Sequence, residues 1–140
     1  MDCELCHGDG GAVLWQNDLC RVVSVDEPGL PGFLRVILNR HESEMTDLPE
    51  PERAAFMAVV FAVEGHVRRC LEPDKINLAS LGNMTPHLHW HVIPRWRDDR
   101  HFPAPVWAPA RHGAPVPAGR AAACARMAAT LPGALGPGRP

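Results

Sequence analysis

The 140-residue chain lacks several features that would place it in a broad functional class. It has no block of five or six like charges, and its net charge is only −2, so we do not expect a nucleic-acid-binding protein. No apolar run approaches the ~20 residues that a transmembrane helix needs, and the first ten residues lack the basic-then-apolar order of a secretory signal. We therefore expect a cytoplasmic protein that does not bind membranes.

The cysteines do not form the even, regularly spaced set of a disulfide framework. There are five, and apart from one Cys-x-x-Cys pair they are scattered along the chain, which fits a reducing compartment. The pair itself, Cys3 and Cys6, is either half of a structural zinc site or two free thiols, and the spacing alone leaves both interpretations open.

The composition changes after about residue 102. Residues 103–140 contain eight Pro, five Gly, twelve Ala and four Arg but no acidic residue, whereas residues 1–102 carry nearly all the Val, Ile and Phe. We therefore expect one folded domain over residues 1–107 and a loosely ordered or disordered Pro/Ala/Gly-rich tail over residues 108–140. Residues 119–130 favour a short helix, but they offer few large side chains that would dock it.

Hydropathy patterns in the first 107 residues predict five strands and one long helix. Three apolar runs separated by turn residues predict strands at residues 12–16, 19–25 and 33–38. A helix of about twenty residues follows, because apolar side chains recur with helical period at Phe56, Val60, Val63, Val67 and Leu71. Two more strands are predicted at residues 76–81 and 88–93. This order indicates an α+β fold, an antiparallel sheet of about five strands with one long helix packed across it.

The densest chemistry lies in residues 87–93, which read His-Leu-His-Trp-His-Val-Ile. Because side chains alternate along a strand, His87, His89 and His91 are predicted on one face and the intervening apolar residues in the core. Two interpretations remain open at this point. The three imidazoles hold a transition metal with an open position for water, or one imidazole is a nucleophile whose tautomer is set by its neighbours.

Residues 87–93 resemble the signature of the histidine-triad (HIT) family, His-φ-His-φ-His-φ-φ with φ apolar, at all seven positions. The resemblance extends to residues 26–41, which run from an aspartate through Pro-Gly and an apolar strand to Asn-Arg-His. Residues 77–95 are similar to bacterial members described as diadenosine tetraphosphate hydrolase-like. The resemblance covers about residues 1–107 and implies the HIT-like α+β fold and a homodimer.

The resemblance also implies an enzyme that acts at the α-phosphate of adenosine-type nucleotides, either dinucleoside polyphosphates or nucleoside phosphoramidates. In this interpretation His89 attacks phosphorus and forms a covalent nucleotidyl intermediate, and His91 orients it through a main-chain carbonyl. His87 completes the catalytic set, and catalysis requires no cofactor. The implied substrate contacts to ribose or phosphate are Asp26, Asn77, Asn83 and Thr85.

Some HIT relatives complete a Cys-x-x-Cys pair with two histidines, which implies here a structural zinc site of Cys3, Cys6, His41 and His87, with His7 as a competing ligand. Phe33 stands where many relatives carry histidine. Two alternative functions are kept: a nucleotide-binding regulatory module with little turnover, because a fold alone does not imply activity, and a trihistidine metalloenzyme.

Overall fold

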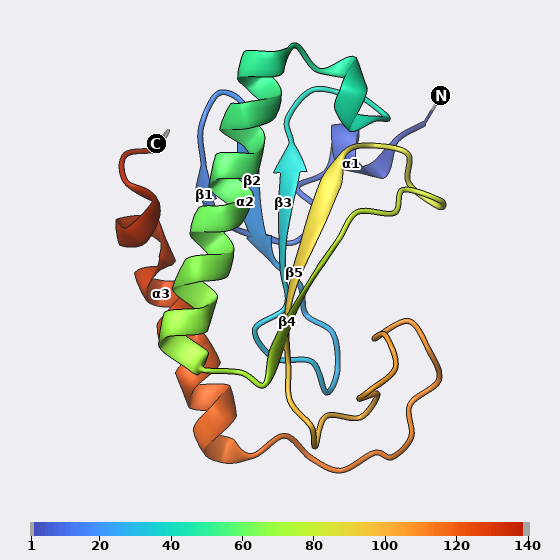
Figure 1. Cartoon of the computed structure of the whole chain (residues 1–140), viewed down its shortest axis with the longest axis vertical. Coiled ribbons are helices and arrows are strands. Elements are labelled where there is room, and N and C mark those ends of the chain that lie inside the picture. The colour runs from blue at the N-terminus through green and yellow to red at the C-terminus, as the bar shows by residue number, and fades with distance from the viewer. Residues whose placement is uncertain (1, 139–140) are drawn as a thin grey trace.

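Five strands form one antiparallel sheet in the computed structural model, which describes residues 2–138 (Figure 1). In chain order the elements are α1 (Glu4–His7), β1 (Ala12–Gln16), β2 (Cys20–Ser24), β3 (Leu34–Leu38), the 3-10 helix η1 (Met45–Asp47), α2 (Glu50–Leu71), β4 (Lys75–Ala79), β5 (His89–Arg95) and α3 (Ala118–Leu135). The sheet order is β1-β2-β3-β5-β4, with every neighbouring pair antiparallel. The predicted α+β fold is confirmed, and residues 1, 139 and 140 of the predicted domain and tail lie outside the described residues.

Helix α2 crosses one face of the sheet, and the main core lies between them (Figure 1). Four of the residues that predicted this helix are fully buried there, namely Phe56, Val60, Val63 and Val67. Each such side chain contributes about 1.5–3 kcal/mol on burial. The helix ends where Glu72 adopts a left-handed φ of 44°, one residue before Pro73, which cannot continue a helix.

The opposite face of the sheet carries two smaller apolar clusters with a polar strip between them. One cluster packs the N-terminal segment on the sheet and contains Cys3, Leu5, Val23 and Ile37. The other packs a loop that follows β5 and contains Leu30, Phe33, Ile93 and Val106. The histidines of β5 lie on this face, because they alternate with residues that point into the main core.

The C-terminal segment differs from the expected loose tail, because residues 118–135 form helix α3 beside α2 (Figure 1). Alanine is the strongest helix former, and its small side chain lets α3 approach α2 closely. Cys124, Met127 and Leu131 share one face of α3 and are buried. The His66 ring of α2 lies 3.0 Å from the Met127 carbonyl oxygen. Arg120 near the start of α3 pairs with Asp98, and Trp15 Nε1–H donates to the Gly136 carbonyl just after its end. A few buried side chains and several polar contacts therefore dock this helix.

No helix within residues 2–138 is both long enough and apolar enough to span a lipid bilayer.

Candidate active site

Strand β5 brings the predicted histidines to the face of the sheet away from α2. Leu88 and Val92 pack in the main core and Trp90 packs against it, as the alternation predicts. The imidazoles are nevertheless well covered, with exposed fractions of 1% for His87, 9% for His89 and 4% for His91. The face that carries them is therefore a partly closed site, not an open polar surface.

One ring nitrogen of His89 is held by the backbone. Its Nδ1 lies 2.6 Å from the main-chain carbonyl oxygen of His87, so Nδ1–H donates to that oxygen. The family resemblance implied that the main-chain carbonyl of His91 accepts this bond. In the structure the acceptor is instead the carbonyl of His87, two residues before His89. Among residues 2–138 no hydrogen-bond partner is found for Nε2 of His89. This tautomer leaves the Nε2 lone pair free for attack on an electrophile.

His91 packs beside His89 as a neutral ring. The two ring centroids are 4.9 Å apart with the planes at 90°, and the ring of Trp107 lies 5.0 Å from His91 on another side. Burial, with smaller contributions from His89 and Arg35, lowers the pKa of His91 to about 3. At neutral pH this ring therefore supports His89 by packing, without adding a positive charge.

Two cavities meet at His89. One has a volume of about 320 Å³ and is lined by His91, Arg35, Trp107 and the loop of residues 81–85 as well as by His89. The other, of about 260 Å³, lies on the side of residues 43–46 and Ser80. A small polar ligand therefore has room on either side of the His89 ring. We call the first space the Arg35 cavity.

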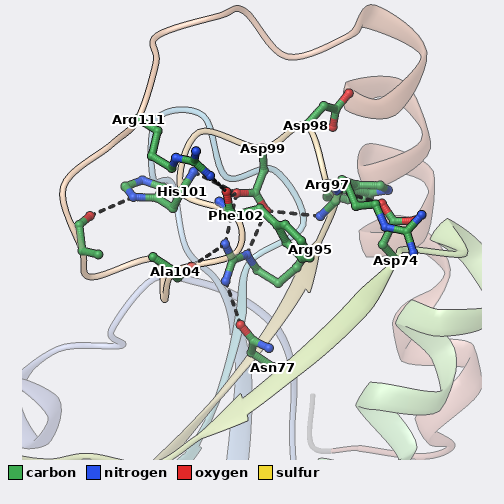
Figure 2. Close-up of polar contacts among 12 residues, drawn as sticks. Asp74, Asn77, Arg95, Arg97, Asp98, Asp99, His101, Phe102, Ala104 and Arg111 are labelled. Atoms are coloured by element: carbon green, nitrogen blue, oxygen red, sulfur yellow. Dashed lines mark hydrogen bonds and ion pairs between the residues drawn. The ribbon is translucent and has the colours of Figure 1, made fainter.

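The predicted substrate contacts fall into two groups. Asn83 and Thr85 line the Arg35 cavity together with His89. Asp26 lies exposed in a turn and lines neither cavity at His89. The Asn77 side chain accepts a hydrogen bond of 2.8 Å from Arg95 at the far end of β5, and it lines neither cavity (Figure 2).

Sequence reasoning did not include two residues that line the same cavity, Arg35 and Trp107. Arg35 is the one charged residue in the apolar run 33–38, which is the signal that could have found it. Trp107 belongs to a loop whose position depends on tertiary contacts, and its side chain is 51% exposed. No sequence pattern places that indole beside His91.

The loop of residues 96–111 is anchored by a buried ion pair (Figure 2). Arg95 and Asp99 are paired through Nε and Oδ2 at 2.8 Å, with side chains only 2% and 4% exposed. The Asp99 carboxylate also accepts backbone N–H groups of Trp96, His101 and Phe102. Burial alone would raise the pKa of Asp99, but these hydrogen bonds outweigh it and lower the pKa to about 2. The anchored loop presents Trp107 to the cavity.

The four predicted metal ligands come together at the other end of β5. The ligand atoms of Cys3, Cys6, His41 and His87 all lie within 4.8 Å of one another. His87 Nε2–H donates to the Leu38 carbonyl at 2.6 Å, which leaves Nδ1 facing the Sγ atoms of Cys3 and Cys6 at 3.4 and 3.5 Å. Two thiols and two imidazoles suit tetrahedral zinc, and a carbonyl that fixes the tautomer is the usual partner of a ligating histidine.

The alternative metal arrangements find less support in the geometry. His7 lies outside this cluster, and its ring is 3.3 Å from the Asp2 carboxylate. Within residues 2–138, no metal-binding group contains His89 or His91, because the three triad rings do not converge on one point. A trihistidine metal centre is therefore not formed by this arrangement.

Comparisons with known proteins match the chain to proteins that carry a histidine triad. The sequence profile of the HIT domain matches residues 10–98. AP-4-A phosphorylase from Mycobacterium tuberculosis is 32% identical over 98 residues, covering 66% of this chain and 50% of that protein. The chain thus spans about half the length of the curated relatives it matches.

Among solved structures, a histidine triad protein from Marinobacter aquaeolei has a TM-score of 0.74 at 25% identity, and the match covers 95% of this chain and 96% of that one. A zinc-bound histidine triad family protein from Mycobacterium smegmatis has a TM-score of 0.63 at 23% identity, with 94% of each chain covered.

Proposed function

The chain belongs to the HIT domain family, and on this premise we propose that it is a nucleotidyl hydrolase or transferase that attacks the α-phosphate of adenosine-type nucleotides with His89. The observation that carries the proposal is the hydrogen bond from His89 Nδ1–H to the His87 carbonyl oxygen, beside a cavity. In the tautomer with the proton on Nδ1, the Nε2 lone pair is free to attack phosphorus. Dinucleoside polyphosphates and nucleoside phosphoramidates are the proposed substrates.

The first step forms a bond between His89 Nε2 and the α-phosphorus, and the bond from phosphorus to the leaving group breaks. The leaving group departs with the bonding electron pair, and the nucleotide remains on the imidazole. An amine leaving group also takes up a proton from solvent, so that it is released uncharged. In the second step an acceptor attacks phosphorus, the P–N bond breaks and its electrons return to Nε2. When the acceptor is water, one of its protons is released to solvent.

Stabilisation of the charge on phosphorus is assigned to neutral donors. Asn83 lines the cavity beside His89, and its amide can donate to phosphate oxygens. Thr85 lines the same cavity, but its hydroxyl donates to the Glu4 carboxylate at 2.9 Å and would have to give up that bond to donate to a phosphate. His91, neutral because of its low pKa, supports the His89 ring from the side. The contacts of Asp26 with ribose and of Asn77 with the nucleotide stay predictions from the family resemblance.

The second acceptor is either water or inorganic phosphate, and the relationship to a phosphorylase makes both worth testing. With diadenosine tetraphosphate as substrate, transfer to water releases AMP and ATP, whereas transfer to inorganic phosphate releases ADP and ATP. Chromatographic separation of the products with and without added phosphate therefore distinguishes a hydrolase from a transferase.

A structural zinc ion is part of the proposal. Cys3, Cys6, His41 and His87 would hold it through two sulfur and two nitrogen atoms, a closed donor set that leaves no position for a reacting water. When bound, the ion would tie the N-terminal segment to the start of β5. The proposed chemistry at His89 uses no metal, so protein that remains folded after chelation should keep its activity on a fluorogenic adenosine phosphoramidate.

A homodimer in the cytoplasm is also proposed, on the family resemblance alone. Analytical ultracentrifugation of the purified chain tests the oligomeric state, with a mass of one 15.3 kDa chain contradicting it.

The deciding experiment is His89→Ala, assayed on diadenosine tetraphosphate and on an adenosine phosphoramidate. Loss of a covalent nucleophile should lower kcat by about 10⁴-fold or more, whereas binding of AMP, measured by calorimetry, should persist. The matched control is His112→Ala, which removes an exposed imidazole. A His89→Ala variant that retains most of its turnover contradicts the proposal. A wild-type protein that binds AMP but turns over neither substrate supports the alternative of a regulatory binding module.

A further inference from the structure

Arg35 is a positive charge within the cavity beside the proposed nucleophile. It lies on β3 opposite His91 of β5. The next residue of β3 on the same face of the sheet, Ile37, lies opposite His89. Arg35 lines the cavity together with His89 and His91. The Cα atom of Arg35 therefore lies about 7 Å along the sheet from the residue opposite His89, two residues away by strand rise.

No carboxylate within residues 2–138 forms an ion pair with Arg35, whereas Arg40, Arg95 and Arg120 each have one. Arg95 is paired with Asp99, and Arg120 with Asp98. Arg35 instead makes two long contacts of 3.4 Å, from Nε to His91 Nδ1 and from one terminal nitrogen to the Gly10 carbonyl oxygen. These are weak hydrogen bonds for a group with five N–H donors.

The charge of Arg35 persists although the side chain is half-buried. Burial lowers its pKa, and the more distant carboxylates of Glu4 and Glu27 act in the opposite direction. A guanidinium remains protonated near neutral pH after such a shift. The Glu4 carboxylate accepts a hydrogen bond of 2.9 Å from Thr85 instead. The cavity thus contains a desolvated cation whose donors are mostly available to an anionic ligand.

We propose that Arg35 binds the phosphate groups of the leaving group, and that it makes the enzyme prefer dinucleoside polyphosphates over substrates that release an uncharged amine. This inference rests on the proposed function. When the α-phosphate lies at His89, any further negative charge of the substrate belongs to the leaving group, because the nucleoside is uncharged. A cation displaced from His89 along the sheet is suited to that charge, and Arg binds phosphate in bidentate fashion.

The test compares two substrates that share the adenosine and the α-phosphate but differ in leaving-group charge. These are diadenosine tetraphosphate and an adenosine phosphoramidate with a neutral amine leaving group. Arg35→Met should lower kcat/KM for the tetraphosphate about 10- to 100-fold, the usual effect of losing a charged hydrogen bond. It should change kcat/KM for the phosphoramidate less than about threefold, and Arg35→Lys should restore most of the preference.

A purely structural role of Arg35, through its contact with His91, would lower both activities by the same factor. Equal losses of kcat/KM on the two substrates therefore overturn the proposal, and so does the absence of a loss on either substrate. Arg126→Met is the matched control, because it removes the same charge from an exposed position on α3. It should leave both values of kcat/KM unchanged.

A binding measurement separates failure of this inference from failure of the proposed function. In a His89→Ala background, calorimetry compares the binding of AMP with that of adenosine 5′-tetraphosphate, with and without Arg35→Met. The substitution should weaken tetraphosphate binding at least tenfold and AMP binding little. If wild-type protein turns over neither substrate but this difference is found, the proposed reaction fails and the Arg35 phosphate site stands. If turnover is normal and the difference is absent, the Arg35 site fails alone.

Discussion

The two ends of β5 are both buried and polar, but they are completed in different ways. At the C-terminal end, Arg95 is paired with Asp99, and the remaining donors and acceptors are satisfied by Asn77 and by backbone groups (Figure 2). Just before the N-terminal end, His87 faces Cys3 and Cys6 across weak sulfur contacts of 3.4 and 3.5 Å. The C-terminal end is complete within the chain, whereas the four side chains at the other end are joined to one another only by weak hydrogen bonds that involve sulfur.

The difference teaches where each part of the active site obtains its rigidity. The ion pair at Arg95 anchors the loop that carries Trp107, and it needs nothing beyond the chain. The His87 end positions the carbonyl that orients His89. Within the described residues, the side chains of the four ligands make only one short hydrogen bond, from His87 Nε2 to the Leu38 carbonyl, and their other contacts are sulfur contacts of 3.4 to 3.5 Å. We therefore expect the order of this end to depend on a bound ion.

The largest effect is expected for Asp99→Asn, which leaves Arg95 as an unpaired buried charge. Removing one partner of a buried pair destabilises a protein by about 3–5 kcal/mol, measured here as the free energy of unfolding in urea. The control is Asp98→Asn at the adjacent position, where an exposed carboxylate pairs with Arg120 and the loss should be about 1 kcal/mol or less. Similar losses of unfolding free energy for the two variants would contradict a stabilising role for the buried pair of Arg95 and Asp99.

Metal removal should have the next largest effect and act at the other end. With free zinc at 100 times its dissociation constant, chelation should lower the free energy of unfolding by about 2.7 kcal/mol. Cys6→Ser should abolish this response, whereas Cys70→Ser, which changes an exposed thiol on α2, should retain it. Metal analysis of each variant accompanies the unfolding curves. A chelator response that is absent in the wild type contradicts an ion-dependent His87 end.

Acid should weaken the Arg95 end in a defined range of pH. The pKa of Asp99 is lowered to about 2 in the folded protein from an ordinary value of 3.8, so its contribution is complete above about pH 4. It is lost as the pH falls from about 4 to 2, and it amounts to about 2 kcal/mol. Unfolding free energies of the wild type and of Asp99→Asn should therefore converge over this interval. Parallel curves for the two proteins would contradict the assignment to Asp99.

The smallest effect is expected for Glu4→Gln, at an exposed direct contact near the His87 end. Glu4 accepts a hydrogen bond from Thr85, and such a surface contact is worth about 1 kcal/mol or less. Thermal unfolding should shift little, and the response to chelator should be unchanged. A loss above about 2 kcal/mol would mean that direct protein contacts hold this end instead of an ion.

Most of the fold could be predicted from local patterns, because each strand and the long helix have a hydropathy period that is visible within a few residues. The α2 core positions recur with helical period, and all four that point most directly to the sheet are fully buried. The predicted first strand coincides with β1 at residues 12–16. Helix α3 was not predicted as a docked element, because its few anchors, such as Met127 and Leu131, acquire partners only from α2 and the sheet.

The site was predictable to the extent that residue type and alternation determine it. The alternating histidines are on one face. The meeting of the two cysteines with His41 and His87 was implied by the family resemblance and not by the spacing. Asn77 shows the limit of this reasoning, because an amide on the correct face was engaged by Arg95 at the far end of the strand. Local spacing predicts on which face of the strand a side chain lies, but not which neighbouring group it will hydrogen-bond.

By itself, the sequence determined the element order and the face on which the three imidazoles lie, because both follow from periods of 2 and 3.6 residues. The set of metal ligands came from the family resemblance. Tertiary structure alone decided that the His87 carbonyl sets the His89 tautomer, that Arg35 and Trp107 line the same cavity, and that α3 packs on α2. These depend on contacts between segments distant in the chain, whose geometry is set only when the sheet, helices and loops pack together.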